Sequence, residues 1–293
     1  MKQMDSIRKH DRIQMQIVST CHDLGITAKQ EHRGNGWRAD VFIPRSEKPI
    51  AFEIQLSPQS LSKTLARQSK YSQDGILGCW LFENPVPKLN HERPDLPVFY
   101  VEDTEDSILL VNLGDRRKID LRTFLENFLS HNIQFRNIAK TKSLQNVKIV
   151  FYEMTCWKCK ELNHLYFVET PFYSSCNAKI KVEEGLWDSS SIEYRPEIIE
   201  FAEKFVDDRK DLNLHLAQIK ERFSHTVGDS YMSFGCYKCD SIFGDFYVMD
   251  AKMDAIYDTS LISHQGVIKL KDKYELNIPH WCFPADKRFC DEH

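Results

Sequence analysis

The segment Trp37–Tyr71 reads WRADVFIPRSEKPIAFEIQLSPQSLSKTLARQSKY and predicts the centre of an α/β fold. Two apolar runs, Ala39–Ile43 and Ile50–Leu56, predict neighbouring strands, and the prolines and charges between them predict a hairpin loop. Side chains alternate along a strand, so Glu53 and Gln55 should share one face while the large apolar side chains of the second run share the other.

Two acidic residues interrupt these apolar strands. Glu53 lies at the centre of the second run, and Asp40 lies within the first. Burying an unpaired carboxylate is costly. A divalent cation between the two would neutralise both; alternatively, they are strand-end carboxylates neutralised by Arg38 and Arg45.

The acidic pair belongs to a longer motif. Asp40, Glu53 and Gln55 have the spacing Asp-x12-Glu-x-Gln, which resembles the core motif of the PD-(D/E)xK nuclease superfamily, although Gln55 stands where many members have Lys. The strings RADV, AFEIQLS, RQSKY and GCWLF resemble, more narrowly, the nuclease-like domain of competence protein CoiA and its relatives. This resemblance covers about residues 1–85 and implies a restriction-endonuclease-like mixed sheet flanked by helices.

The resemblance also implies a reaction and a set of site residues. In a metal-dependent nuclease of this type, Asp40 and Glu53 would hold Mg²⁺ or Mn²⁺ with the carbonyl of Ile54, and Gln55 would orient the attacking water. His10, on a helix expected over residues 6–24, would lean over the acids; otherwise it is a packed helix-start histidine. Glu31 is either a further acid near this site or an exposed residue of a strand expected over 27–33.

A basic helix face is expected to meet the substrate. A helix is predicted from about Gln59 to Gln73, with Ser57 as its N-cap and Pro58 at its first position. Its cations are neighbours because they are spaced four and three residues apart. Residues 29–70 hold eight Lys and Arg against four Asp and Glu, a local basic patch that a solvated helix face would also explain. The expected nucleic-acid contacts are Arg38, Lys63, Arg67, Lys70 and Tyr71.

The remainder of the first domain, assigned to residues 1–140, completes the sheet. The apolar run Ile76–Phe82 predicts a buried central strand. Val98–Val101 and Ile108–Leu113 are expected as edge strands, followed by a helix near Leu121–Phe128.

An internal repeat marks the second domain, assigned to residues 145–293. FYEMTCWKC at 151–159 matches YMSFGCYKC at 231–239 with an offset of 80 residues, and YFV at 166–168 matches FYV at 246–248. Each copy predicts a strand, a Cys-x-x-Cys knuckle and a second strand, as in a zinc ribbon with a helical insertion at 194–225. We therefore expect Zn²⁺ on Cys156, Cys159, Cys236 and Cys239.

The cysteines have other possible uses. A redox role for the Cys-x-x-Cys pairs is the alternative to zinc. A further group, Cys176, His280, Cys282 and Cys290, could bind a metal, but the sequence favours a packed segment there.

The chain as a whole indicates a cytoplasmic protein. Its 293 residues suit two domains, its apolar runs are too short to span a membrane, and its N-terminus lacks the apolar segment of a signal peptide. We expect a nuclease acting on DNA, with RNA as the other possible substrate and a protein partner or homo-oligomer possible. The competing hypothesis is a non-catalytic nucleic-acid- or protein-binding protein with a degenerate nuclease fold and a zinc module.

Overall fold

A computed structural model describes residues 8–88, 93–113, 117–170, 172–180, 194–258, 260–271, 275–284 and 288–292. The chain divides into two compact units. Unit 1 comprises residues 1–139, 176–178 and 275–293, and unit 2 comprises residues 140–175 and 179–274. None of the helices in the described part of the chain has both the length and the apolar character needed to span a membrane.

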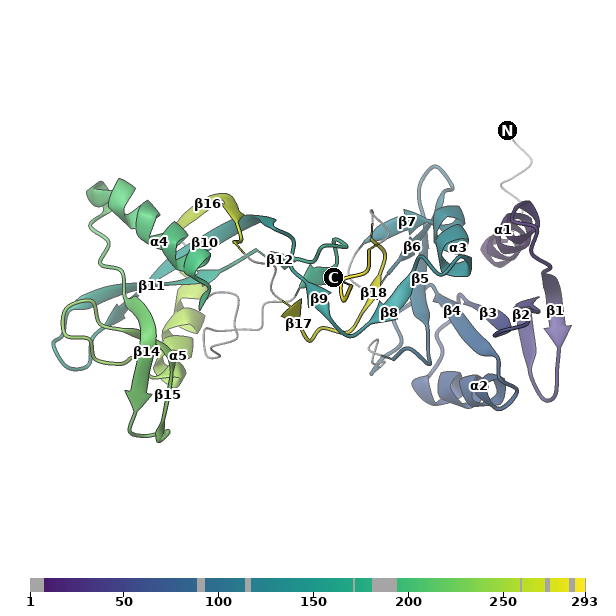
Figure 1. The fold of residues 1–293 in the computed structure, drawn as a ribbon, viewed down its shortest axis with the longest axis horizontal. Helices are drawn as coiled ribbons and strands as arrows, with labels where there is room; N and C mark the ends of the chain where they lie inside the picture. Colours follow the sequence, from purple (N-terminus) through teal and green to yellow (C-terminus); the bar gives the residue numbers. More distant parts are fainter. Residues whose placement is uncertain are drawn as a thin grey trace. The chain divides into compact units, whose positions relative to one another are not determined.

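Unit 1 is built on a seven-stranded mixed sheet whose strands follow chain order (Figure 1). The inner pairs β3–β4 and β4–β5 are parallel, and the remaining pairs are antiparallel. The mixed α/β fold expected from the sequence is thus confirmed. The strands are β1 (Lys29–Arg33), β2 (Arg38–Ile43), β3 (Ile50–Gln55), β4 (Leu77–Phe82), β5 (Val98–Asp103), β6 (Leu109–Asn112) and β7 (Lys118–Asp120).

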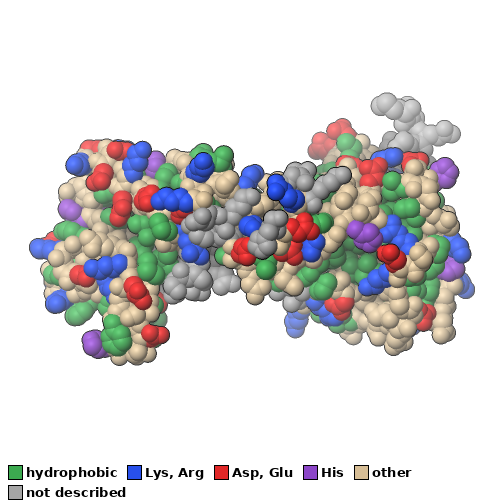
Figure 2. Space-filling model, viewed as in Figure 1, with side chains coloured by type: hydrophobic (Ala, Val, Ile, Leu, Met, Phe, Trp, Pro, Cys, Tyr) green, Lys and Arg blue, Asp and Glu red, His purple; other side chains and the backbone are tan. Residues whose placement is uncertain are grey.

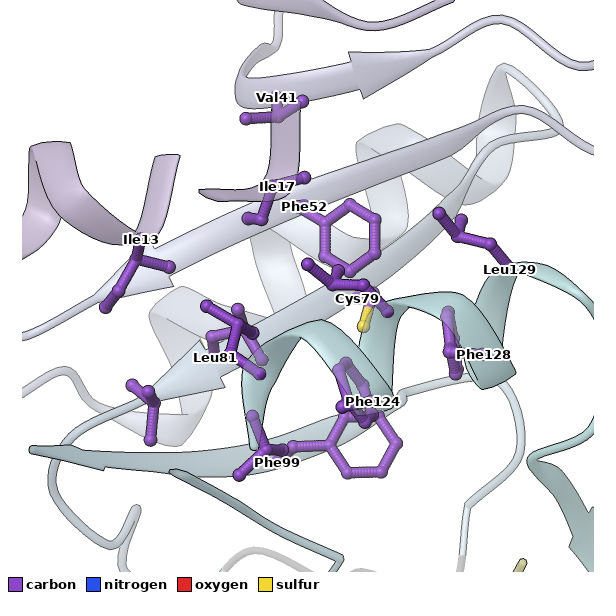
Figure 3. Close-up of a cluster of buried hydrophobic side chains, with 14 of the residues drawn as sticks. Ile13, Ile17, Val41, Phe52, Cys79, Leu81, Phe99, Phe124, Phe128 and Leu129 are labelled. Atoms are coloured by element: carbon purple, nitrogen blue, oxygen red, sulfur yellow. The ribbon is translucent and has the colours of Figure 1, made fainter. Parts of the chain in front are cut away.

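Helices cover both faces of this sheet. Helices α1 (Lys9–Asp23) and α3 (Leu121–Leu129) pack on one face, and α2 (Leu61–Gln73) packs on the other (Figure 1). Figure 3 shows side chains of α1 and α3 meeting those of the strands in the larger core. Strand alternation determines the partition: Phe52 joins this core, while Ala51 joins the smaller core under α2.

Two details differ from the sequence prediction. Helix α2 begins one turn later than expected, because Ser60 rather than Ser57 is its N-cap and its side chain accepts a hydrogen bond from the backbone N–H of Lys63. Strands β5 and β6, both expected at an edge, are inner strands, because β7 extends the sheet beyond them and forms the edge. On β4, Gly78 allows α2 to approach closely, because a Cβ there would meet the Gln68 side chain at 2.1 Å.

The end of the chain also belongs to unit 1. Strand β18 (His280–Cys282) pairs with β8 (Gln134–Arg136), and β17 (Glu275–Leu276) pairs with β9 (Ala139–Lys140). The division therefore differs from the expected domain of residues 145–293, whose last residues pack with unit 1.

Unit 2 has a three-stranded antiparallel sheet in the order β11–β10–β16. Helix α4 packs on β16, where the rings of Phe205 and His264 stack 4.4 Å apart, and α5 packs on β10. Two hairpins, β12–β13 and β14–β15, complete the unit. Its elements are β10 (Leu144–Thr155), β11 (Leu162–Val168), β12 (Phe172–Tyr173), β13 (Lys179–Ile180), α4 (Pro196–Asp208), a 3₁₀ turn (Lys210–Leu212), β14 (Gln218–Ser224), β15 (Asp229–Gly235), α5 (Asp245–Ile256) and β16 (Ile262–Lys269).

Two secondary-structure predictions for unit 2 were wrong. Residues 246–248 lie in α5 rather than in a strand, because Gly244 is followed by a run containing the good helix formers Met, Ala and Lys. The expected helical insertion at 194–225 is helical only in its first half. Its last part is β14, where polar and apolar side chains pair with β15.

Candidate active site and metal centre

Asp40 and Glu53 lie where two neighbouring strands separate. The ladder between β2 and β3 ends at the pair Val41–Phe52, although both strands continue past it. The side chain of Asp40 occupies the gap, and its Oδ2 accepts a hydrogen bond from the backbone N–H of Ile54 at 2.7 Å. The divergence therefore brings an acidic side chain from each strand to the same end of the pair.

Helix α1 completes the surroundings of Asp40. His10 Nε2 lies 3.6 Å from Asp40 Oδ2, so the first turn of the helix does lean over the acid. One turn later, the Gln14 amide donates to the Asp40 carbonyl at 2.8 Å and to Glu31 Oε1 at 3.1 Å. Glu31 also pairs with Arg38. Gln14 was missed in the sequence because a buried amide on a helix has no motif of its own.

Glu53 is the most deeply buried acid of the site, at 1 % exposure. Its carboxylate contacts the Arg67 guanidinium and the Tyr71 hydroxyl, both on α2. Desolvation raises the pKa of Glu53 to about 7, against the opposing effect of Arg67. Tyr71 Oη also contacts the carbonyl of Arg38 at 2.8 Å. A phenol carries one proton, so a protonated Glu53 that donates to Oη would satisfy both contacts.

The cations predicted on α2 have different environments. Arg67 pairs with Glu53 and lies 5.0 Å from the ring centroid of Trp80. Lys70 Nζ donates to the carbonyl of Gly36 at 3.0 Å, while the Lys63 side chain is exposed. A cavity of about 170 Å³ adjoins these groups and is lined by Gly36, Trp37, Arg38, Arg67, Lys70 and Tyr71.

This cavity brings basic and aromatic side chains together. Basic and acidic side chains are interspersed over the visible faces of both units (Figure 2), so a charged substrate would be recognised by local groups. Trp37, which the sequence reading did not assign to the site, adds an aromatic surface, with its ring 5.3 Å from that of Tyr71.

Of the remaining predicted site residues, Ile54 contacts Asp40, whereas Gln55 contacts a neighbouring loop. The Gln55 amide donates to the carbonyl of Ser57 at 2.8 Å, which directs it to the loop before α2. Ile54 is tied to Asp40 through its N–H, and its carbonyl as a metal ligand stays a prediction. Arg45, the alternative partner of the acids, instead donates to the carbonyl of Leu129.

The donor set of this site suits a hard divalent cation. Aspartate and glutamate oxygens are the ligands that Mg²⁺ and Mn²⁺ take. Asp40 raises the pKa of Glu53 through like-charge repulsion, so the two carboxylates interact electrostatically. A cation bound by both would relieve this repulsion and would replace Arg67 as the partner of Glu53.

A separate centre in unit 2 gathers the four repeat cysteines. Their sulfur atoms all lie within 4.8 Å of one another, with 3.6 Å between Cys156 and Cys239 and 3.5 Å between Cys159 and Cys236. Tetrahedral zinc with Zn–S bonds of about 2.3 Å would place its sulfurs about 3.8 Å apart. The four cysteines could therefore bind zinc.

The two knuckles share one backbone design. Cys156 N–H donates to the Glu161 carbonyl at 2.8 Å, and Cys236 N–H donates to that of Ser241 at 2.9 Å. Lys160 and Asp240, also 80 residues apart, both have positive φ, at 64° and 58°. The repeat read from the sequence is thus present at the knuckles.

Neighbouring polar groups contact two sulfurs of this centre, those of Cys236 and Cys239. Hydrogen bonds from Ser241 lower the pKa of the Cys239 thiol to about 6. The buried Asn163 amide donates to Cys236 Sγ at 3.6 Å, and its carbonyl oxygen accepts from the N–H of Tyr237. Such outer contacts orient metal ligands.

Comparison with protein families gives a match. The model described as "Competence protein CoiA, nuclease-like domain" matches residues 8–157. Comparison with curated proteins and with solved structures returned no match.

Proposed function

The chain belongs to the family of the competence protein CoiA nuclease-like domain, and from this we propose that unit 1 is a metal-dependent nuclease that hydrolyses phosphodiester bonds of DNA. The observation that carries the proposal is the convergence of Asp40 and Glu53 at the point where β2 and β3 separate. A buried acid costs stability, and a functional role for Glu53 would account for that cost.

Each residue at the site has a proposed role. Asp40 and Glu53, with the Ile54 carbonyl, would hold Mg²⁺ or Mn²⁺, which would polarise the phosphate and lower the pKa of a bound water. His10, 3.6 Å from Asp40, would accept or relay a proton at Nε2. Gln55 would orient the water, because a neutral amide cannot deprotonate it.

Substrate binding would use the basic cavity beside Glu53. Arg67 pairs with Glu53 in the structure, and its guanidinium would be released to a phosphate oxygen when a cation takes over that carboxylate. Arg38 and Lys70 line the same cavity, and Lys63 extends the row along α2. The row would follow the nucleic-acid backbone without reading its sequence.

Unit 2 would act as a structural or docking module. Four thiolates in a closed set leave zinc no open position for chemistry. Its proposed role is to position nucleic acid, a protein partner or a second copy of the chain. No disulfide joins any of the nine cysteines, which fits a reducing, cytoplasmic location.

A non-catalytic binding protein is the second candidate. Two observations favour it: Gln55 replaces the commoner lysine, and Arg67 already pairs with Glu53. In this alternative the site would bind nucleic acid without cleaving it.

One experiment separates the two candidates. The purified full chain is dialysed free of added metal and assayed on single- and double-stranded DNA and RNA with Mg²⁺, Mn²⁺, Ca²⁺ or no addition. Omitting chelators leaves the zinc centre intact. Cleavage with Mg²⁺ or Mn²⁺ that is lost in both Asp40→Asn and Glu53→Gln supports the nuclease. Binding without cleavage under every condition supports the alternative.

A further inference from the structure

A second group of metal-ligating side chains lies in unit 1. One sulfur from each of three cysteines and one nitrogen from a histidine all lie within 4.8 Å of one another, contributed by Cys176, His280, Cys282 and Cys290. The three cysteines are at most 1 % exposed and the histidine is 9 % exposed. The sequence favours a packed segment here, because His280-Trp281-Cys282 near a chain end is more easily explained by packing than by metal binding.

The sulfur geometry argues for a metal rather than a disulfide. Cys282 Sγ and Cys290 Sγ are 3.6 Å apart, which is far longer than a disulfide bond of about 2.05 Å. It matches the separation of about 3.8 Å between two thiolates on one tetrahedral zinc. The same spacing occurs in the four-cysteine centre of unit 2.

The histidine is oriented as a metal ligand. Its Nδ1 lies 2.9 Å from the carbonyl of Ile278, which places the ring proton on that nitrogen. Its Nε2 is buried and makes no hydrogen bond within the described residues. A metal-bound histidine has this arrangement, in which a backbone carbonyl fixes one nitrogen and the other points at the ion.

Strand alternation explains how the ligands are presented. His280 and Cys282 lie on one side of β18, and Trp281 between them points to the other side, into the core of unit 1. Trp281 packs against Phe99 and Phe135, with ring centroids 5.1 and 5.5 Å away. The core therefore holds β18 in the orientation that directs both ligands to the cluster.

Two arginines hold the other ligand segments. Arg117 donates to the carbonyl of Cys176 at 2.6 Å and to that of Trp281 at 2.7 Å, so one guanidinium joins two ligand-bearing segments. Arg136 pairs with Asp291 at 3.3 Å and lies 4.3 Å from the ring centroid of Phe289. These contacts flank Cys290 on both sides.

We propose that Cys176, His280, Cys282 and Cys290 bind a structural zinc ion that fastens the end of the chain to unit 1. Three thiolates and an imidazole are a common donor set for structural zinc, and four protein ligands leave no position open for catalysis. The site is independent of the proposed nuclease chemistry, since it shares no residue with the acidic pair. Its role is to join residue 176, β18 and the segment at Cys290.

Metal content tests the proposal directly. The full chain, purified without chelator, should contain about two zinc ions, one at each centre. Elemental analysis should find about one in Cys290→Ser and about one in Cys236→Ser. The double variant should hold almost none. Cys21→Ala removes a buried cysteine of unit 1 outside the cluster and should keep both ions.

A second measurement covers the case in which Cys290→Ser fails to fold. His280→Cys retains four ligands, so it should keep both ions, and its cobalt-substituted form should show stronger sulfur-to-cobalt charge-transfer absorption than the parent. About one zinc ion in the parent protein that Cys290→Ser keeps and Cys236→Ser loses would overturn the proposal. So would an unchanged zinc content in Cys290→Ser, or a native disulfide between Cys282 and Cys290 found by mass spectrometry.

Discussion

The guanidinium of Arg67 pairs with the buried carboxylate of Glu53, at the place where a hydrolytic site would need a divalent cation. The pair only partly compensates for burial, because the pKa of Glu53 still rises to about 7. A buried acid whose desolvation is only partly compensated destabilises the protein at neutral pH. Sites that sacrifice stability in this way are commonly functional.

Glu53→Gln should therefore stabilise unit 1 while abolishing cleavage. The folded protein keeps a proton on Glu53 that the unfolded chain releases between pH about 4.5 and about 7, so parental stability falls as pH rises through this window. A shift of this size corresponds to about 3 kcal/mol above pH 7 and to almost nothing below pH 4.5. Urea unfolding at pH 5 and pH 8, without added divalent cation, measures the difference.

The matched control is Glu83→Gln, which alters an acid of unit 1 that is well exposed and paired with Lys9. Its effect on the free energy of unfolding should be small. A Glu53→Gln variant less stable than the parent at pH 8 would show that the charged Glu53–Arg67 pair supports the fold, and would remove the argument from destabilisation.

Gln55 offers a graded test of the reaction. Gln55→Ala should reduce cleavage less than loss of either acid, because the amide orients a water and does not carry charge. Gln55→Lys should retain or raise the rate, since it restores the residue that many members of the superfamily have. Single-turnover rates with saturating enzyme measure the chemical step. A Gln55→Ala rate equal to the parental rate would mean that Gln55 serves only its hydrogen bond to Ser57.

Local sequence patterns predicted unit 1 well and unit 2 less well. Strand alternation placed Glu53 and Gln55 on the face opposite the large apolar side chains, and the resemblance to the nuclease motif implied that Asp40 would lie near Glu53. The start of α2 was wrong because Ser57 and Ser60 are both good caps, and tertiary packing selected Ser60. Residues 246–248 were placed in a strand because the repeat was extended beyond its knuckles.

Long-range contacts were the main source of error. Trp281 enters a core formed more than 140 residues earlier in the chain, and no local pattern announces that contact. The group of Cys176, His280, Cys282 and Cys290 was named as a possible metal site, but a packed segment was favoured because no local pattern brings Cys176 to the other three. The adjacent sequence His280-Trp281-Cys282 did carry a signal, since alternation puts two ligands on one side of a strand and an apolar anchor on the other.

The basic row on α2 should contribute separable phosphate contacts. Lys63→Ala and Lys70→Ala should each weaken DNA binding and reduce the slope of log affinity against log salt by about one unit on duplex DNA. Fluorescence anisotropy across a salt series measures both quantities. Lys118→Ala changes a cation on β7, an edge strand of the sheet, and should leave both the affinity and the salt slope unchanged. Parental slopes in the two α2 variants would make this a solvated helix face.

The zinc centre of unit 2 should support that unit alone. Cys236→Ser should release its ion and unfold much of unit 2, because thiolate binding couples metal affinity to folding. Hydrogen exchange should show lost protection in β10, β11 and β15, while β3 and β4 of unit 1 stay protected. Equal loss of protection in both units would contradict their independence.

Trp281 gives a test of how far unit 1 depends on the end of the chain. The side chain is 8 % exposed and packs among Phe99, Phe128 and Phe135, so Trp281→Ala should leave a large cavity and cost about 3–5 kcal/mol. Trp157→Ala, at a side chain 63 % exposed in unit 2, is the matched control and should cost far less. Denaturant unfolding measures the loss of stability. Hydrogen-exchange protection in β5 and α3 then shows whether that loss occurs in unit 1. A Trp281→Ala variant as stable as the control would mean that residues 275–293 lie against unit 1 without supporting it, and that a fragment ending near residue 139 should fold unaided.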